Sequence, residues 1–156
     1  PVTKAEFREI ELEFATAPTR EEIEDKLANG SRYEKNWAKN MLADLNDGGI
    51  TMKYPYPIQV WQLGEPTKES KPLTWISLGG EVVVDYSLRL KKELGEETTW
   101  VTGYANDVMC YIPSERVLKE GGYEGARAML YYQKPSPWKP GLENQIVETV
   151  HDLADE

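Results

Sequence analysis

Residues 73–83 read Leu-Thr-Trp-Ile-Ser-Leu-Gly-Gly-Glu-Val-Val, an apolar run that ends at two glycines and a glutamate. The run at residues 73–78 predicts a buried strand, and the apolar spacing that follows predicts a helix beginning at Glu81. Residues 98–101 form a second apolar run and predict a second strand. Because strands alternate with helices, we expect an α/β fold: a layered mixed sheet with flanking helices and some parallel pairing.

Glu81 follows Gly79 and Gly80 directly, at the carboxyl end of the first predicted strand. In open α/β sheets, ligands bind beyond the carboxyl ends of the strands. Glycine has no Cβ, so the pair lets the backbone turn sharply and leaves room for a ligand. The same residues also fit a plain tight turn followed by a first-turn carboxylate that complements the helix dipole. Local features leave both interpretations open.

A second polar segment follows the second predicted strand. Residues 103–111 read Gly-Tyr-Ala-Asn-Asp-Val-Met-Cys-Tyr. A carboxylate and a phenol at neighbouring strand ends can face one cleft. Glu81 and Tyr111 are therefore candidates for the same site. Cys110 lies beside Tyr111, but no histidine is near it in the sequence to lower its pKa, so we interpret it as a small buried residue.

The first part of the chain predicts one strand and two helices. Apolar residues alternate with glutamates over residues 9–14, the period of a strand with one solvated face. Residues 20–28 and 32–45 predict helices, because each begins with a capping box in which a hydroxyl and a carboxylate satisfy free amides. The two boxes are Thr19-x-x-Glu22 and Ser31-x-x-Glu34.

The second of these helices carries an apolar stripe at four-residue spacing, formed by Tyr33, Trp37, Met41 and Leu45. Amphipathic helices bury such a stripe, so we expect these side chains to be core. Further along, apolar patterns predict a strand at residues 58–63, a strand at residues 129–132 and an acidic helix at residues 142–153.

The composition is that of an ordinary soluble globular protein: 156 residues, 40% hydrophobic and 29% charged. We expect residues 1–156 to form one domain or a substantial part of one. The net charge of -9 argues against nucleic acid as a partner, because phosphate binding requires a basic surface. No apolar run reaches eighteen residues, so we expect no transmembrane segment.

The segment from Trp75 to about Gly125 resembles the end of the catalytic domain of the neutral/alkaline, non-lysosomal ceramidase family. The resemblance lies in the order and spacing of several short pieces rather than in any one of them. After the first strand these are Gly80-Glu81, Arg89-Leu90 in a helix, Gly-x-x-Asn from Gly103 to Asn106, Tyr111, and Tyr123-Glu124-Gly125.

The resemblance implies that residues 1–156 are the C-terminal portion of a ceramidase-like catalytic domain. The intact protein would be a zinc-dependent amidohydrolase that cleaves the N-acyl amide bond of a ceramide-like lipid or of another N-acyl small molecule. Such an enzyme is a hydrolase of sphingolipid metabolism that is secreted or periplasmic. In that family two histidines from earlier in the domain, a glutamate and a tyrosine hold Zn²⁺, and the last two fall on Glu81 and Tyr111. The tyrosine that stabilises the reacting carbonyl falls on Tyr123. Gly80 and Asn106 fall in the loops of the site. Two ligands of one zinc ion place the oxygens of Glu81 and Tyr111 within roughly 5 Å of each other.

The chain also departs from the family pattern. Val82-Val83 replaces the usual Thr-Thr after the glutamate, and Ser87 or a near neighbour replaces a glycine in the helix. Asp107 and Met109 replace aromatic and hydroxyl residues in the loop before the tyrosine. These departures leave the expected metal ligands Glu81 and Tyr111 unchanged. They affect the identity of the expected substrate.

The chain has one histidine, His151, on the flank of the apolar stripe of the last predicted helix. We interpret it as a surface or partly packed residue, because an isolated histidine is weak evidence for metal. The sequence opens at Pro1 without an initiator methionine, so we expect an upstream part of the same polypeptide to supply both histidine ligands. This chain alone should then bind Zn²⁺ weakly or not at all.

Two other classes of function stay open. The chain can be a catalytically inactive ceramidase-like module that binds or acts as a scaffold. It can also be a structural α/β domain in which Glu81 and Tyr111 are ordinary surface residues. The separation of these two side chains distinguishes the structural interpretation from the others.

Overall fold

The computed structural model describes residues 2–67 and 71–155. Its main sheet has four strands in the order β1 (Val2–Glu13), β2 (Lys53–Leu63), β3 (Leu73–Leu78) and β5 (Thr99–Thr102). The first two pairings are antiparallel, and β3 pairs with β5 in parallel. The expected mixed sheet with flanking helices is therefore confirmed.

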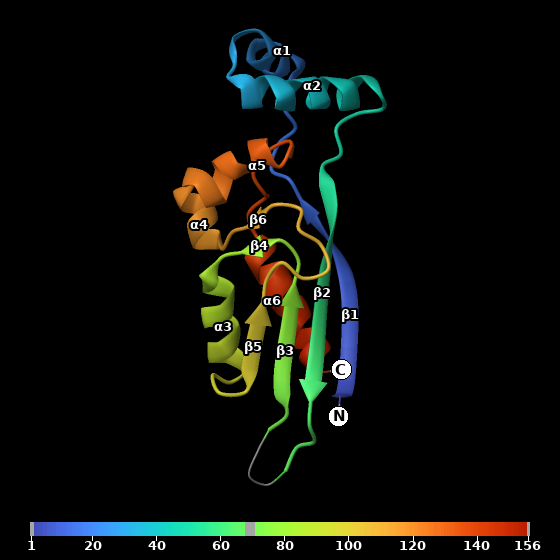
Figure 1. Cartoon of the computed structure of the whole chain (residues 1–156), viewed down its shortest axis with the longest axis vertical. Helices are drawn as coiled ribbons and strands as arrows, with labels where there is room; N and C mark the ends of the chain where they lie inside the picture. Colours follow the sequence, from blue (N-terminus) through green and yellow to red (C-terminus); the bar gives the residue numbers. More distant parts are fainter. Residues whose placement is uncertain (1, 68–70, 156) are drawn as a thin grey trace.

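Helices cover one face and one edge of the sheet (Figure 1). Helix α6 (Leu142–Asp155) packs against β1 and β2, and α3 (Val84–Leu94) packs against β5 and α6. The predicted C-terminal helix is confirmed. Alternation along the strands directs every second side chain toward these helices.

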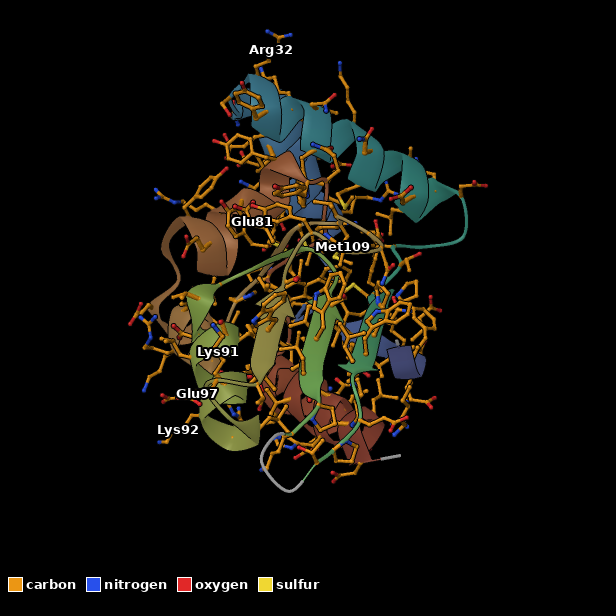
Figure 2. The ribbon with its side chains drawn as sticks, turned by 60° about the horizontal axis from the view of Figure 1, so that its bottom comes forward. Arg32, Glu81, Lys91, Lys92, Glu97 and Met109 are labelled. Atoms are coloured by element: carbon orange, nitrogen blue, oxygen red, sulfur yellow. The ribbon has the colours of Figure 1, made fainter. Side chains whose placement is uncertain are left out.

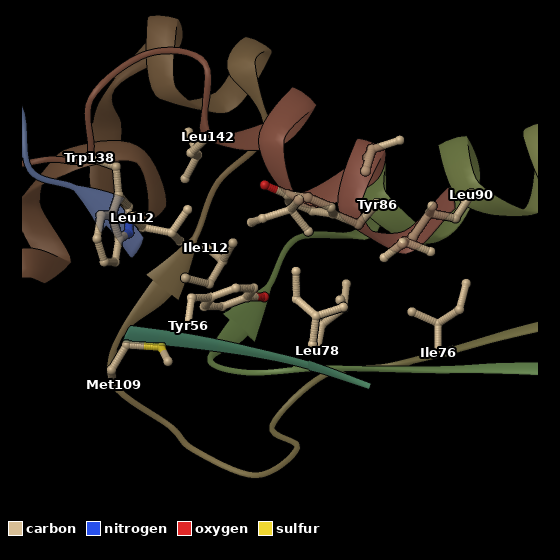
Figure 3. Packing of buried hydrophobic residues seen from close by; sticks show 14 of the residues in the cluster. Leu12, Tyr56, Ile76, Leu78, Tyr86, Leu90, Met109, Ile112, Trp138 and Leu142 are labelled. Carbon is tan, nitrogen blue, oxygen red and sulfur yellow. The ribbon is translucent and has the colours of Figure 1, made fainter. Parts of the chain in front are cut away.

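The main core lies between the sheet and the helices (Figure 3). Tyr56, Ile76, Leu78, Tyr86 and Leu90 are fully buried there. The two buried tyrosine hydroxyls have partners, because Tyr56 donates to the Gly79 carbonyl at 2.9 Å and Tyr86 to the Pro113 carbonyl at 3.0 Å. Satisfied hydroxyls let these large rings fill the core without an unpaired polar atom.

The other face of the sheet carries a row of indoles. Trp61 pairs with Trp75 across β2 and β3, and Trp75 pairs with Trp100 across β3 and β5. Trp75 and Trp100 are exposed. The sheet is thus buried on the α6 face and open to solvent on the tryptophan face.

A helical hairpin stands at one end of the molecule (Figure 1). It consists of α1 (Arg20–Asn29) and α2 (Arg32–Asn46), and both predicted capping boxes are present. Trp37 and Met41 are buried in a separate small core with Ile23, as the stripe predicted. Tyr33 is 58% exposed, so its assignment to the core was wrong.

Glu81 does not begin a helix. Glu81–Val82 is a short strand, β4, that pairs in parallel with β6 (Tyr111–Ile112), and α3 starts only at Val84. The reason is a competing ladder, in which the Glu81 amide donates to the Cys110 carbonyl at 2.9 Å. The interpretation of Glu81 as a first-turn carboxylate is therefore wrong.

The expected strand at residues 129–132 is also wrong. After α4 (Glu115–Glu120) the chain forms a π-helical turn, η1 (Tyr123–Arg127), and continues directly into α5 (Ala128–Tyr131). Met129 is buried in the main core, and Leu130 packs against the small core of the hairpin. A short buried apolar run has the same pattern in a helix as in a strand.

Candidate functional site

The short β4–β6 pair brings Glu81 and Tyr111 together. The two residues are direct partners in the parallel register, although thirty positions separate them in the chain. The pair lies beyond the carboxyl ends of β3 and β5, between the main sheet and the helical hairpin (Figure 1). Figure 2 likewise shows Glu81 between the main sheet and the helical hairpin. This is the edge at which open α/β sheets bind ligands.

The turn before Glu81 requires glycine at position 80. Gly80 has a φ of +71°, and a Cβ there would lie 2.7 Å from a side-chain carbon of Ile112 and 2.8 Å from the Cys110 carbonyl oxygen. Only a residue without a side chain allows this approach. Gly80 therefore shapes the turn that leads into Glu81.

The polar segment at residues 103–110 is tied to this turn by backbone hydrogen bonds. The Tyr104 amide donates to the Gly80 carbonyl at 2.8 Å, and the Gly80 amide donates to the Asp107 carbonyl at 2.7 Å. The Tyr54 hydroxyl on β2 donates to the Asp107 carboxylate at 2.7 Å. Both polar segments quoted from the sequence therefore form one folded unit around Glu81.

The Glu81 carboxylate is surrounded by tyrosine hydroxyls. Hydrogen bonding with Glu81 raises the pKa of both Tyr111 and Tyr104 to about 12. Burial raises the pKa of Tyr132, and the charge of Glu81 raises it further. These phenols therefore keep their protons at neutral pH.

Tyr123 lies against Tyr111 from the helical side. The two rings meet edge to face with their centroids 5.6 Å apart, and Tyr123 is 46% exposed. Gly121 and Gly122, with φ of +72° and +70°, turn the chain from α4 into the π-helical turn that carries Tyr123. Such π-turns are frequent at functional sites. Glu81, Tyr111 and Tyr123, which come from three separate segments, thus share one cluster.

Asn106 occupies a different position from the other predicted site residues. Its φ is +66°, and its side-chain Nδ2 lies 3.5 Å from the side-chain Oε1 of Gln59 on β2. The structure describes no contact between Asn106 and the Glu81 cluster. Asn106 shapes the loop, since asparagine adopts left-handed backbone more readily than most residues.

Sequence reasoning missed the tyrosines that complete the cluster. Tyr104, Tyr131 and Tyr132 were not assigned to the site. Tyr132 packs on Tyr111 with centroids 6.3 Å apart, and Tyr131 lies 6.0 Å from Tyr123 and 5.0 Å from Tyr33 of α2. A line of ring contacts therefore runs from Tyr111, the ladder partner of Glu81, to the helical hairpin. Tyr104 was visible inside the quoted polar segment, but nothing in the sequence indicated that its hydroxyl reaches Glu81.

His151 and Cys110 stand apart from the site. His151 Nε2 lies 2.7 Å from Glu93 Oε2 where α6 meets α3, which agrees with a partly packed helix residue. Cys110 is fully buried, and this burial raises the pKa of its thiol to about 12. The thiol is therefore an inert core group.

The described residues do not by themselves make a zinc site. Glu81 and Tyr111 supply two oxygen donors, whereas a zinc site takes three or four protein ligands, commonly including imidazoles. Within residues 2–67 and 71–155, no group of three or more His, Cys, Asp or Glu side chains could hold a metal ion. Any zinc site built on Glu81 and Tyr111 must take its other ligands from outside the described residues.

A large cleft adjoins the tyrosine cluster. Its volume is about 790 Å³, and it lies among α1, α2, α5 and the loop at residues 134–137. Trp37, Met129 and Leu130 give it apolar walls. Glu81 and Tyr111 do not line it, but Tyr131 does, and Tyr131 contacts Tyr123. The cleft and the cluster therefore share a wall.

Comparison with known proteins gave no relative: no protein-family model matches the chain, and neither a curated protein nor a solved structure matches it. The resemblance to neutral ceramidases thus depends on the residues quoted from the sequence. In the part of the chain that the structure describes, no helix is long and apolar enough to cross a membrane.

Proposed function

We propose that this chain is part of a zinc-dependent amidohydrolase resembling neutral ceramidase, which hydrolyses the N-acyl amide bond of a ceramide-like lipid. One observation carries the proposal. Glu81, Tyr111 and Tyr123 are the residues that the resemblance assigns to metal binding and catalysis, and they lie in one cluster although they come from separate segments. A structural domain with unrelated surface residues would not need this convergence.

In the intact protein, Glu81 and Tyr111 would be two ligands of the zinc ion, and two histidines of the upstream polypeptide would complete the set. Zinc bound in this way supplies a water of near-neutral pKa and polarises a carbonyl. Glu81 contributes a negative charge. Tyr111 contributes a phenol oxygen, and the interaction with Glu81 raises the pKa of that phenol to about 12 in the zinc-free chain.

Tyr123 would act on the substrate directly. Its exposed ring stands beside Tyr111, where its hydroxyl can donate a hydrogen bond to the oxyanion that forms at the acyl carbon. Loss of one such donor typically costs roughly 10²–10³ in rate. The role of Tyr123 is therefore stabilisation of the transition state, while Glu81 and Tyr111 hold the metal.

The cleft that adjoins the tyrosine cluster is suited to an apolar substrate. Its volume of about 790 Å³ lies within the usual range for small-molecule sites, and its walls are largely apolar. Tyr131 connects it to Tyr123. A hydrocarbon chain in this cleft would extend away from an amide held at the tyrosine cluster.

The alternative is a catalytically inactive module that binds an N-acyl ligand or serves as a scaffold. One observation favours it. The described residues provide no complete metal site. The two functions differ in whether the intact protein turns over substrate.

The test is activity of the full-length polypeptide on a panel of N-acyl lipids and N-acyl amino acids, with zinc and with a chelator. We expect zinc-dependent hydrolysis. Glu81→Gln should lower it by at least roughly 100-fold, because loss of a mere outer partner of a metal ligand already costs about 10–100-fold. Glu97→Gln, at an exposed glutamate far from Glu81 in Figure 2, should leave it unchanged. A zinc-loaded full-length protein without turnover on the panel would favour the binding module.

A further inference from the structure

The tryptophan face of the main sheet carries its side chains in ordered rows. Residues in register on adjacent strands point to the same face, and this face is opposite to the buried Ile58, Val60 and Ile76. One row across the four strands is largely aromatic and consists of Ala5, Trp61, Trp75 and Trp100. The next row is largely polar and consists of Phe7, Gln59, Ser77 and Thr102. Aromatic rings and hydrogen-bonding groups therefore lie side by side on this face.

The aromatic side chains present free ring surface to the solvent. Trp100 is 59% exposed, Phe7 is 56% exposed and Trp75 is 38% exposed. In the part of the chain that the structure describes, no ring contact joins these side chains to one another or to Trp61. Trp75 Nε1 donates to Thr102 Oγ1 at 2.8 Å, which holds that indole in one orientation. A ligand can therefore stack on these rings without displacing another aromatic side chain.

The polar groups beside the indoles are neutral and have unused hydrogen-bonding capacity. Among the described residues, the Nε1–H groups of Trp61 and Trp100 have no acceptor. Asn106 Nδ2 lies 3.5 Å from Gln59 Oε1, a long contact that a ligand hydroxyl can replace. The loop presents Asn106 to this face with a left-handed backbone, at a φ of +66°. Neutral donors and acceptors are thus available next to the exposed rings.

Charge and size select the class of ligand. Neither row contains an ionisable side chain, and the chain carries a net charge of -9. Nucleic-acid bases that stack on aromatic side chains need a positively charged groove for their backbone, which excludes that class here. With up to about 250 Å² per aromatic side chain, the exposed fractions leave at most roughly 400 Å² of ring surface. A stable contact with a second copy needs about 800 Å² per partner, so the rows suit a smaller, neutral ligand.

We propose that the tryptophan face binds a neutral oligosaccharide, which lies along the aromatic row from β1 to β5. The C–H groups on one face of a sugar ring are weakly positive and the face of an indole is negative, so the two stack. Sugar hydroxyls bond to Gln59, Thr102 and Asn106. Adjacent strands lie about 4.8 Å apart, so the row spans roughly 14 Å and accommodates a few sugar rings. The inference is independent of the proposed function, because these residues do not contact the Glu81 cluster.

The test is isothermal titration calorimetry of the 156-residue chain with four neutral probes: cellohexaose, xylohexaose, mannohexaose and chitohexaose. We expect at least one of them to bind. Trp100→Ala should weaken that binding by at least roughly 10-fold, because it removes the most exposed ring of the row. Tyr33→Ala is the control, since it removes a ring of similar exposure from the helical hairpin, and it should leave the affinity unchanged.

Asn106→Gly tests the polar groups separately from the rings. Glycine keeps the positive φ, so this variant loses the side-chain amide without backbone strain, and the affinity should fall by about 2–10-fold. A chain that binds none of the four hexasaccharides would overturn the proposal, as would an unchanged affinity in Trp100→Ala. Sedimentation and binding to phosphatidylcholine vesicles would then identify a second copy or a lipid surface as the occupant, if Trp100→Ala abolishes that association.

Discussion

At the scale of single residues, Gly80 determines where Glu81 points. Its Cα is enclosed by Ile112, Met109 and the carbonyl of Cys110, and its φ of +71° belongs to the left-handed region. Glu81 follows immediately and enters the β4–β6 ladder from this turn. Gly80 can make this close turn because it has no Cβ. The direction of the Glu81 carboxylate therefore depends on glycine at position 80.

We expect Gly80→Ala to lower the free energy of unfolding by about 1–3 kcal/mol more than Gly121→Ala, because overpacking in a close contact costs this much. Gly121 is the control, since its φ of +72° is close to that of Gly80 and nothing lies within 4 Å of the place that an added methyl group would take. Urea denaturation of both variants gives the difference. Equal losses of stability would mean that the contacts around Gly80 relax without cost.

At the scale of elements, one carboxylate organises the helical hairpin. Glu34 accepts the Ser31 amide at 2.9 Å in the capping box of α2, and it accepts Lys26 Nζ of α1 at 2.8 Å. The hydrogen bond from Lys26, followed by those from Ser31, lowers the pKa of Glu34 to about 2. The charged form of Glu34 therefore stabilises both the start of α2 and its contact with α1.

The pH dependence follows from the sign of this shift. Because the folded pKa lies below the ordinary value of 4.5, the stabilisation is complete above about pH 4.5 and is lost as the pH falls toward 2. Glu34→Gln should lower the Tm at pH 7 and reduce its decline between pH 5 and 2. Glu21→Gln, at an exposed glutamate of α1, should reproduce the wild-type profile in thermal denaturation. An unaltered acid profile in Glu34→Gln would contradict the assignment.

At the scale of the whole molecule, Glu143 joins three helices. From α6 it accepts Arg89 of α3 at 2.9 Å and the backbone amide of Glu115, the first residue of α4, at 2.7 Å. Its side chain is only 12% exposed. This carboxylate fixes α4, and hence the following turn that carries Tyr123, relative to the helices that cover the sheet.

Glu143→Ala should lower the free energy of unfolding by about 1–3 kcal/mol, because it leaves the partly buried Glu115 amide without its partner and removes one of the partners of the Arg89 guanidinium. Glu148→Ala, an exposed position on the same helix, controls for the change in helix composition and charge. Denaturant unfolding followed by tryptophan fluorescence measures both. A loss no greater than that of Glu148→Ala would show that water replaces the carboxylate.

Elements specified by neighbouring residues could be predicted. The capping boxes at Thr19 and Ser31 involve partners three positions apart, and both helices begin where those boxes placed them. The run at residues 73–78 is a strand with the predicted bounds. Its partners were not evident, because an apolar run does not say which strand lies next to it.

The wrong predictions lie where contacts with distant segments of the chain outweigh the structure that the local sequence pattern favours. Glu81 pairs with Tyr111 in a strand ladder, so its backbone is extended although the following residues favour a helix. Residues 129–131 are helical because they pack against the hairpin as well as the main core. Neither partner can be identified from the spacing of apolar residues within the segment itself.

For the candidate site, the residue types and their order in the chain were enough to select Glu81, Tyr111 and Tyr123 through a family resemblance. Their role in zinc binding and catalysis stays a prediction. The contacts of Tyr104, Tyr131 and Tyr132 became evident only in the folded chain. Local signals act over three or four residues, through a cap or a turn of helix. The cluster around Glu81 depends on chain segments brought together by β3–β5 and β4–β6 pairing, which the core stabilises as a whole.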